Sequence, residues 1–201
     1  MVIGPRGLTQ VAKDLNGSIT QRPGGENQLL VQTLSPATKS PLMPLVRRIA
    51  DAGCNLADTR VSTLGNDVCV TLLAQGSWDA VAKLETTLDK LAREQDELHL
   101  VHYRTRARAA QPHLLPYLVE IVAADRSGIL AEVMEFFIRN DISIEQLTSL
   151  RYQAMQTGAG MFQAQITVGI PAESHIASLR DDFLELCDRL NLDAIIDPVK
   201  F

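Results

Sequence analysis

The sequence predicts an α+β protein built from two tandem ferredoxin-like βαββαβ domains, each with a four-stranded antiparallel sheet. Segments with the apolar spacing of strands and of helices follow one another in the same order twice along the chain. Aligning Asn55-Leu56 with Ser143-Ile144 gives an offset of 88 residues, about the size of one small domain of this kind. We therefore expect two domains of one fold rather than a single large one.

The first domain is predicted between residues 27 and 104. Its strands are expected at 29–34, 55–63, 67–74 and 98–103. The first helix stops at Gly53 and has an apolar face formed by Leu42, Leu45, Val46 and Ile49. The second helix has apolar residues at three-and-four spacing, namely Val81, Leu84, Leu88 and Leu91. Trp78, at the start of that helix, is expected to anchor the helix on the sheet rather than to bind a partner.

The second domain is predicted between residues 117 and 201, with strands at 117–124, 142–150, 161–170 and 192–196. Its helices have apolar faces formed by Ile129, Val133, Phe136 and Phe137, and by Ile176, Leu179, Phe183, Leu186 and Leu190. We expect the side chains of Met134, Phe136, Phe137 and Phe162 to belong to the core. The turn through Gly158 and Gly160 is followed by a strand, so it lacks the helix start that a phosphate-binding loop requires.

Two segments lie outside these domains. Residues 1–26 are rich in Gly and Pro and are expected to form a loosely ordered extension, with at most a weak helix around residues 8–15. Residues 105–116 are expected to form a linker. The basic cluster at its start is interpreted as solvated linker rather than as a nucleic-acid-binding patch, and it consists of Arg104, Arg106 and Arg108.

The composition argues against several classes of function. The balance of 19 basic and 24 acidic residues gives a net charge of −5, without the basic excess that direct nucleic-acid binding needs. Aromatic residues make up only 4% of the chain, too few for an RNA-stacking sheet surface. The histidines and the three cysteines form no metal-ligand pattern, so no metal or cofactor is expected. Without a membrane span or an apolar signal segment, a cytoplasmic location is expected.

One segment combines residues that suit a small charged ligand. It lies where a strand ends and a helix begins, and the first turn of a helix has free N–H groups that attract an anion. An adjacent carboxylate attracts an ammonium group, so the segment suits a free amino acid. The alternative is structural, with the aspartate capping the helix and the glycine packing tightly. The candidate residues are Asp125, Arg126, Ser127, Gly128, Ile129 and Leu130.

Three short motifs resemble those of a known family. The segment Asp125-Arg126-Ser127-Gly128 is similar to the D-R-P-G loop of ACT domains, which are small amino-acid-binding regulatory modules. Gly53-Cys54-Asn55 and Gly76-Ser77-Trp78 resemble elements of the glycine cleavage system transcriptional repressor family, and the resemblance covers roughly residues 28–200. It implies a non-enzymatic protein that binds a DNA-binding transcriptional activator and responds to a small amino acid such as glycine. Homodimer formation stays open.

The resemblance also implies where the ligand binds. ACT modules that pair side by side hold a ligand between the first loop of one copy and the second strand of the other, which places residues 125–130 opposite Asn55. A weaker second site would combine Ser40 with Ser143, because the first domain has Ala-Thr-Lys-Ser-Pro at 37–41 instead of the D-R-P-G loop. Ser40 is expected to cap the helix that begins at Pro41. Alternatively, Asn55 is a turn residue that bonds its own backbone.

The sequence leaves two other functions open. One is an ACT-type allosteric subunit of an amino-acid metabolic enzyme, which differs from the repressor in its protein partner. The other is an acylphosphatase-like hydrolase on the same fold. That activity requires an arginine in a phosphate-binding loop, and Arg126 is the candidate, although the adjacent Asp125 would repel the substrate.

Overall fold

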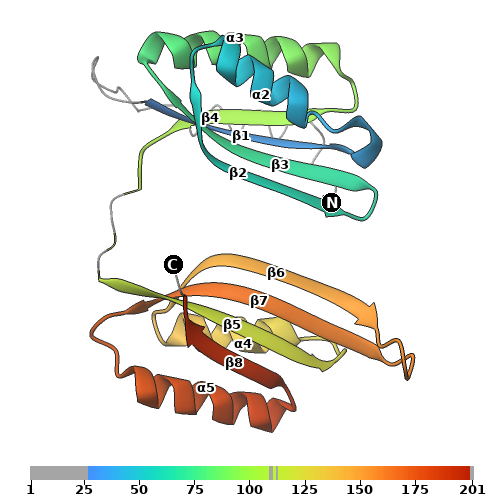
Figure 1. The fold of residues 1–201 in the computed structure, drawn as a ribbon, viewed down its shortest axis with the longest axis vertical. Coiled ribbons are helices and arrows are strands. Elements are labelled where there is room, and N and C mark those ends of the chain that lie inside the picture. Colours follow the sequence, from blue (N-terminus) through green and yellow to red (C-terminus); the bar gives the residue numbers. More distant parts are fainter. Residues whose placement is uncertain (1–26, 109–110, 112, 200–201) are drawn as a thin grey trace. The chain divides into compact units, whose positions relative to one another are not determined.

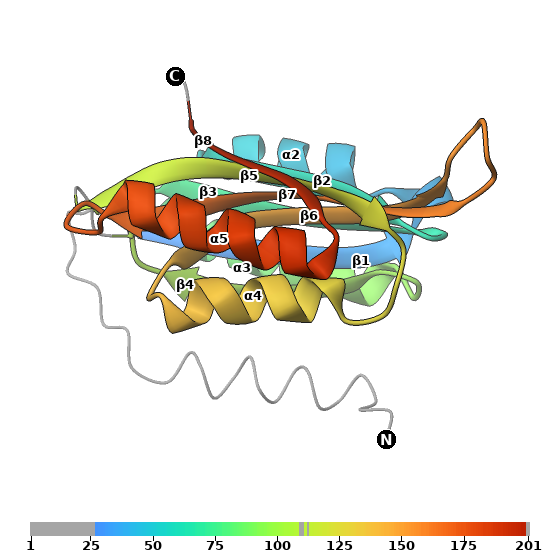
Figure 2. The same ribbon diagram turned by 90° about the horizontal axis from the view of Figure 1, so that it is seen from below.

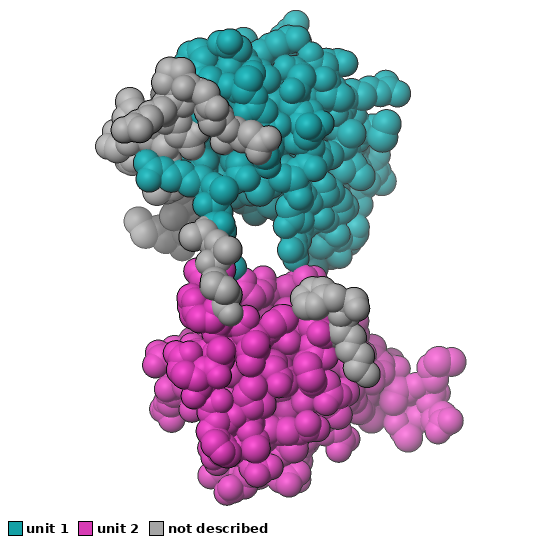
Figure 3. Space-filling model, turned by 60° about the vertical axis from the view of Figure 1, so that its left-hand side comes forward, with its two compact units in different colours: residues 1–108 teal, residues 109–201 magenta. Residues whose placement is uncertain are grey.

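The computed structural model describes residues 27–108, 111 and 113–199, so the predicted extension over residues 1–26 lies outside the described part of the chain. The chain divides into two compact units, residues 1–108 and residues 109–201 (Figure 3). Each unit contains a four-stranded antiparallel sheet with helices interleaved in the order βαββαβ. The predicted fold class is therefore confirmed.

Unit 1 has its strands in the order β2-β3-β1-β4, with all neighbours antiparallel. In chain order its elements are β1 (Asn27–Pro36), a short 3-10 helix (Ala37–Lys39), α2 (Leu42–Asp51), β2 (Asn55–Leu64), β3 (Asp67–Gly76), α3 (Trp78–Glu94) and β4 (His99–Thr105). Both α-helices cover the same face of the sheet (Figure 1). Alternate side chains of β1 and β3 are buried against them, as expected for a sheet with one covered face.

Unit 2 repeats this arrangement with the strand order β6-β7-β5-β8. Its elements are β5 (Leu114–Ala124), α4 (Ile129–Arg139), β6 (Ser143–Gln153), β7 (Gly160–Pro171), α5 (Ile176–Leu190) and β8 (Asp193–Pro198). Figure 2 shows α4 and α5 side by side over one face of the sheet. β5 begins at Leu114 instead of residue 117, because its first residues already pair with the end of β7, Leu114 with Pro171.

The core of each unit lies between its helices and its sheet. In unit 2, Phe137 of α4 and Phe183 of α5 are completely buried, and their ring centroids lie 5.3 Å apart. Phe162 is buried as well, and Met134 and Phe136 pack against this cluster, so the prediction that these residues belong to the core is confirmed. Burying each large apolar side chain stabilises the unit by about 1.5–3 kcal/mol. Within the described residues, no helix is long and apolar enough to cross a membrane.

The edge strands β2 and β6 carry the same irregularity. The β2–β3 register shifts between Leu56 and Asp58, and the β6–β7 register shifts between Ile144 and Gln146. A bulge of this kind adds one residue to the edge strand and increases its twist. The two bulges are separated by the 88-residue offset found in the sequence, so the repeat extends to local backbone geometry.

The start of α2 differs from the prediction. Ser40 was expected to cap this helix, but α2 begins at Leu42 with Pro41 as the preceding residue, and no side chain accepts a hydrogen bond from the first turn. Ser40 instead ends the short 3-10 helix. The predicted Ser40 cap is wrong because Pro41 precedes the helix instead, and its carbonyl oxygen accepts the first helical hydrogen bond, from the Leu45 N–H at 2.9 Å.

The region around Trp78 and Arg104 also differs from the prediction. Arg104 lies within β4 and donates to Glu85 of α3, so it does not belong to a solvated linker. Trp78 is 51% exposed, and the Arg104 guanidinium carbon lies 5.2 Å from its ring centroid. The prediction that Trp78 anchors α3 on the sheet is wrong. The other face of α3 provides the anchor, through the buried side chains of Val81, Leu84, Leu88 and Leu91.

Candidate functional site

The loop between β5 and α4 forms one side of a pocket of about 510 Å³ in unit 2. All six predicted residues from Asp125 to Leu130 line it. The opposite side comes from β6 and β7, with Ser149, Leu150, Arg151 and Phe162. The structure therefore brings the predicted segment together around one pocket, whereas ligand binding there stays a prediction.

The start of α4 leaves backbone donors free to face a ligand. The residue before the helix is Gly128, whose φ of +92° is a left-handed conformation that favours glycine. No side chain accepts a hydrogen bond from the first turn of α4. By contrast, α3 is capped by the Ser77 hydroxyl and α5 by the His175 ring. The N–H groups at the start of α4 are therefore suited to an anionic group such as a carboxylate.

Asp125 is fixed by contacts other than a helix cap. Its backbone N–H donates to the Gly160 carbonyl oxygen at 2.9 Å, which ties the loop to the start of β7. Its carboxylate forms an ion pair with the Arg151 guanidinium of β6. The alternative in which Asp125 merely caps α4 does not hold, because the carboxylate is directed to β6 and the helix start is uncapped.

Arg126 forms the second ion pair of the loop. Its two terminal nitrogens donate to the two carboxylate oxygens of Glu132 in α4, at 3.1 and 2.5 Å. Hydrogen bonding from Arg126 lowers the pKa of Glu132 below its ordinary value. The pair is exposed to solvent, and it holds the loop against the first turn of α4. The pocket thus contains two arginines, each already paired with a carboxylate of its own unit.

Comparison with known proteins identifies the type of domain. Residues 40–101 match the family model of the ACT domain. The chain is 28% identical over 176 residues to the glycine cleavage system transcriptional repressors of Escherichia coli (strain K12) and Shigella flexneri, which covers 88% of this chain and 92% of each relative. The two tandem units both have the ACT-type βαββαβ fold. The predicted resemblance to the glycine cleavage system transcriptional repressor family is confirmed.

Solved structures with the same two-unit fold match this chain over almost their whole length. A crystal structure assigned to a glycine cleavage system transcriptional repressor has a TM-score of 0.65 at 23% identity, covering 88% of this chain and 99% of that one. A protein of unknown identity from Galdieria sulphuraria has a TM-score of 0.70 at 14% identity, covering 88% and 100%. At these identities the likeness establishes the fold alone. Together with the curated relatives, the ACT assignment supports a regulatory role.

The other predicted site residues of the ACT units lie at equivalent strand starts. Asn55 begins β2 and pairs with Gln75, whereas Ser143 begins β6 and its hydroxyl donates to Glu145 at 2.8 Å. Asn55 is at a strand start rather than within a tight turn. Ser40 lines a separate pocket of about 740 Å³ in ACT unit 1, together with Ser35, Lys39, Gln95, Asp96, Glu97 and Leu98. The pairing of these residues across the two ACT units stays a prediction.

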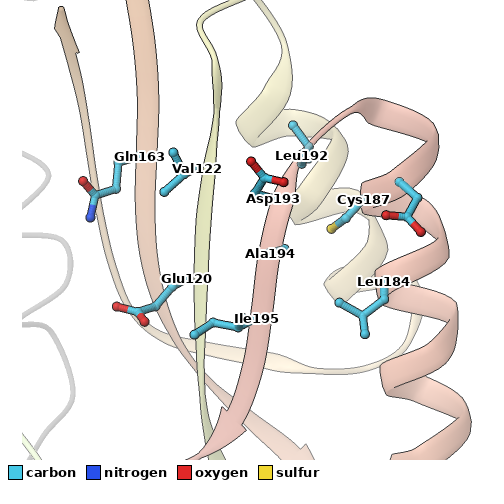
Figure 4. Close-up of a pocket in the computed structure, with 10 residues that line it drawn as sticks. Glu120, Val122, Gln163, Leu184, Cys187, Leu192, Asp193, Ala194 and Ile195 are labelled. Carbon is cyan, nitrogen blue, oxygen red and sulfur yellow. The ribbon is translucent and has the colours of Figure 1, made fainter. Parts of the chain in front are cut away.

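A further pocket of ACT unit 2, about 470 Å³ in volume, lies around β8 (Figure 4). Glu120 and Gln163 lie on one side of this strand, and Cys187 of α5 lies on the other. Burial, with a smaller effect of Asp188, raises the pKa of the Cys187 thiol to about 11. The thiol is therefore protonated near neutral pH and is a poor nucleophile. None of the lining residues is cationic, so this pocket is less suited to a carboxylate than the one beside α4.

Sequence reasoning missed the residues that β6 and β7 contribute to the site. Arg151 lies opposite Phe162 in the β6–β7 register, and β7 pairs with β5, which leads into the loop. The only sequence signal was that Arg151 is a basic residue near the end of the predicted strand at 142–150. That signal becomes meaningful only when the strand order is known.

Proposed function

We propose that this protein is a non-enzymatic, amino-acid-responsive regulator that represses glycine cleavage genes by binding a DNA-binding transcriptional activator. The observation that carries this proposal is the similarity to the Escherichia coli repressor over 88% of the chain and 92% of that relative. The net charge of −5 agrees with a protein that acts through a partner rather than on DNA directly. On this reading the protein works in the cytoplasm.

The pocket beside α4 is the proposed sensor site. The free N–H groups of the first helical turn would donate hydrogen bonds to the carboxylate of a small amino acid such as glycine, and Asp125 would accept hydrogen bonds from its ammonium group. Asn55 of the other ACT unit is proposed to complete this site. Ser40 and Ser143 are proposed to form a weaker second one, because residues 37–41 contain neither an aspartate nor a glycine.

The ion pairs of the loop weigh against a hydrolase. An acylphosphatase-like reaction needs an arginine that is free to bind a phosphate, and Arg126 is engaged with Glu132 by two hydrogen bonds. The neighbouring Asp125 adds negative charge at the place where the phosphate would bind. We therefore propose that Arg126 orders the loop rather than binds substrate.

The repressor role is tested by removing the gene from its source organism and measuring transcripts of the glycine cleavage genes with and without glycine. We expect the transcripts to rise in the absence of glycine and to fall again when the wild-type gene is restored. A transcript level that is indifferent to the deletion would refute the role. Co-purification with a DNA-binding regulator is expected, whereas recovery of a metabolic enzyme would support an allosteric subunit instead.

The sensor role is tested by calorimetry on the purified chain with a panel of amino acids. A ligand at about 100 times its dissociation constant should stabilise the folded state by roughly 2.7 kcal/mol, which a thermal shift detects. Asp125→Asn should abolish this shift, and Asn55→Ala should reduce it. Glu135→Gln, which alters an exposed pair elsewhere on α4, is the matched control and should leave it unchanged.

A further inference from the structure

The Asp125–Arg151 ion pair joins a fixed carboxylate to a movable guanidinium. The side chain of Asp125 is only 16% exposed, and its backbone is held by Gly160. The side chain of Arg151 is 77% exposed and extends from the edge strand β6. Breaking this pair would therefore require movement of Arg151 alone, while Asp125 keeps its position in the pocket.

Arg151 also lines the pocket in which Asp125 is proposed to receive the ammonium group of a ligand. A carboxylate with so little exposed surface offers a ligand little room beside the guanidinium that already contacts it. The ammonium group and Arg151 would carry the same charge and would compete for the same oxygen atoms. Only one of the two cations can satisfy Asp125 at a time.

We propose that Arg151 is a specificity-determining residue that occupies the ammonium position of the empty pocket and must be displaced by the ligand. This inference rests on the proposed sensor function. A ligand with an ammonium group replaces the guanidinium and leaves the Asp125 charge compensated. A ligand without one cannot replace it, so it binds only through the N–H groups of α4. Arg151 thereby restricts the site to compounds that have both a carboxylate and an ammonium group.

The strength of the pair suits this role. The Arg151 guanidinium is largely exposed to water, which screens its attraction to Asp125, so loss of the pair should change an equilibrium by roughly five-fold or less. A ligand can therefore displace Arg151 without a large loss of affinity. Without Arg151 the ligand has no cation to displace, so an amino acid should bind more strongly. The increase should be modest because the ion pair itself is weak.

The test compares ligands that differ only in the ammonium group. Calorimetry on the full chain would compare glycine with glycolate and L-alanine with L-lactate. In each pair the second compound has a hydroxyl group in place of the ammonium group. In Arg151→Gln, we expect the dissociation constants of the two amino acids to fall by about two- to five-fold. The dissociation constants of the two hydroxy acids should not fall. A purely structural effect of Arg151 would change both classes alike.

Two controls separate the possible outcomes. Arg139→Gln removes an exposed arginine that pairs with Glu135 on α4, outside the pocket, and should change none of the four constants. In an Asp125→Asn background, where amino-acid binding is expected to be lost, Arg151→Gln should not restore it. Weaker amino-acid binding in Arg151→Gln, or equal changes for both ligand classes, would overturn the inference while leaving the sensor function intact. Failure of all four ligands to bind any variant would remove the sensor function and the inference together.

Discussion

Arg104 of β4 binds the carboxylate of Glu85 in α3 through two parallel hydrogen bonds, from its Nε atom at 2.9 Å and from a terminal nitrogen at 2.8 Å. Both side chains are largely buried, with 15% and 23% of their surface exposed. Hydrogen bonds to Glu85 raise the pKa of Arg104 further above its ordinary value. The pair therefore ties the last strand of unit 1 to its longer helix, and the exposed ring of Trp78 lies against the same guanidinium.

We expect Glu85→Gln to lower the free energy of unfolding of unit 1 by about 1–2 kcal/mol, because one charge-assisted hydrogen bond is lost and Arg104 remains partly buried. Urea unfolding followed by tryptophan fluorescence measures this directly, since Trp78 is the only tryptophan of the chain. Glu94→Gln, at the exposed end of α3, is the control and should have almost no effect. Equal stability of the two variants would show that the bidentate pair does not stabilise the unit.

A pair of serine substitutions tests the helix starts of unit 1. The Ser77 hydroxyl accepts a hydrogen bond from the Ala80 N–H at 3.2 Å, so Ser77→Ala should destabilise the unit by about 1 kcal/mol. Ser40 has no such role, so Ser40→Ala should be nearly neutral. Thermal unfolding of the two variants checks this difference. A larger loss of stability in Ser40→Ala than in Ser77→Ala would instead support the helix cap that the sequence predicts at Ser40.

Gly128 is expected to be sensitive to substitution even without a ligand. Its φ of +92° is unfavourable for any residue with a side chain, although the space around it would accommodate a methyl group. Gly128→Ala should therefore destabilise unit 2 by about 1–2 kcal/mol through backbone strain. Its melting transition should fall by several degrees. Ser127→Ala is the matched control and should melt like the wild type, because Ser127 does not cap α4.

Cys187 should make the stability of unit 2 depend on alkaline pH. Its pKa is raised from 9.0 to about 11, so the folded state holds the thiol proton more tightly than the unfolded state does. This contribution is fully present below pH 9 and is lost as the pH rises from about 9 toward 11. Urea unfolding between neutral pH and pH 11 would measure it, with Cys187→Ala as the reference. Parallel pH profiles for the two proteins would contradict the expectation.

The resemblance between the two units was determined by the sequence alone, because it depends on local patterns. Strand and helix spacing is visible within short windows, and it predicted both four-stranded sheets and the aromatic core around Phe137. The segment from Asp125 to Leu130 was likewise recognisable, since a strand end, a glycine and a helix start are adjacent in the chain.

Only the tertiary structure decided which side chains meet at these positions. Arg151 is 26 residues from Asp125 in the chain and reaches it because β7 lies between β5 and β6 in the sheet. Arg104 is 19 residues from Glu85 and meets it because α3 packs over β4. Such pairs depend on strand order and on which face of a strand a side chain takes. Local spacing determines the elements of this protein, and their packing determines the charges that line its pocket.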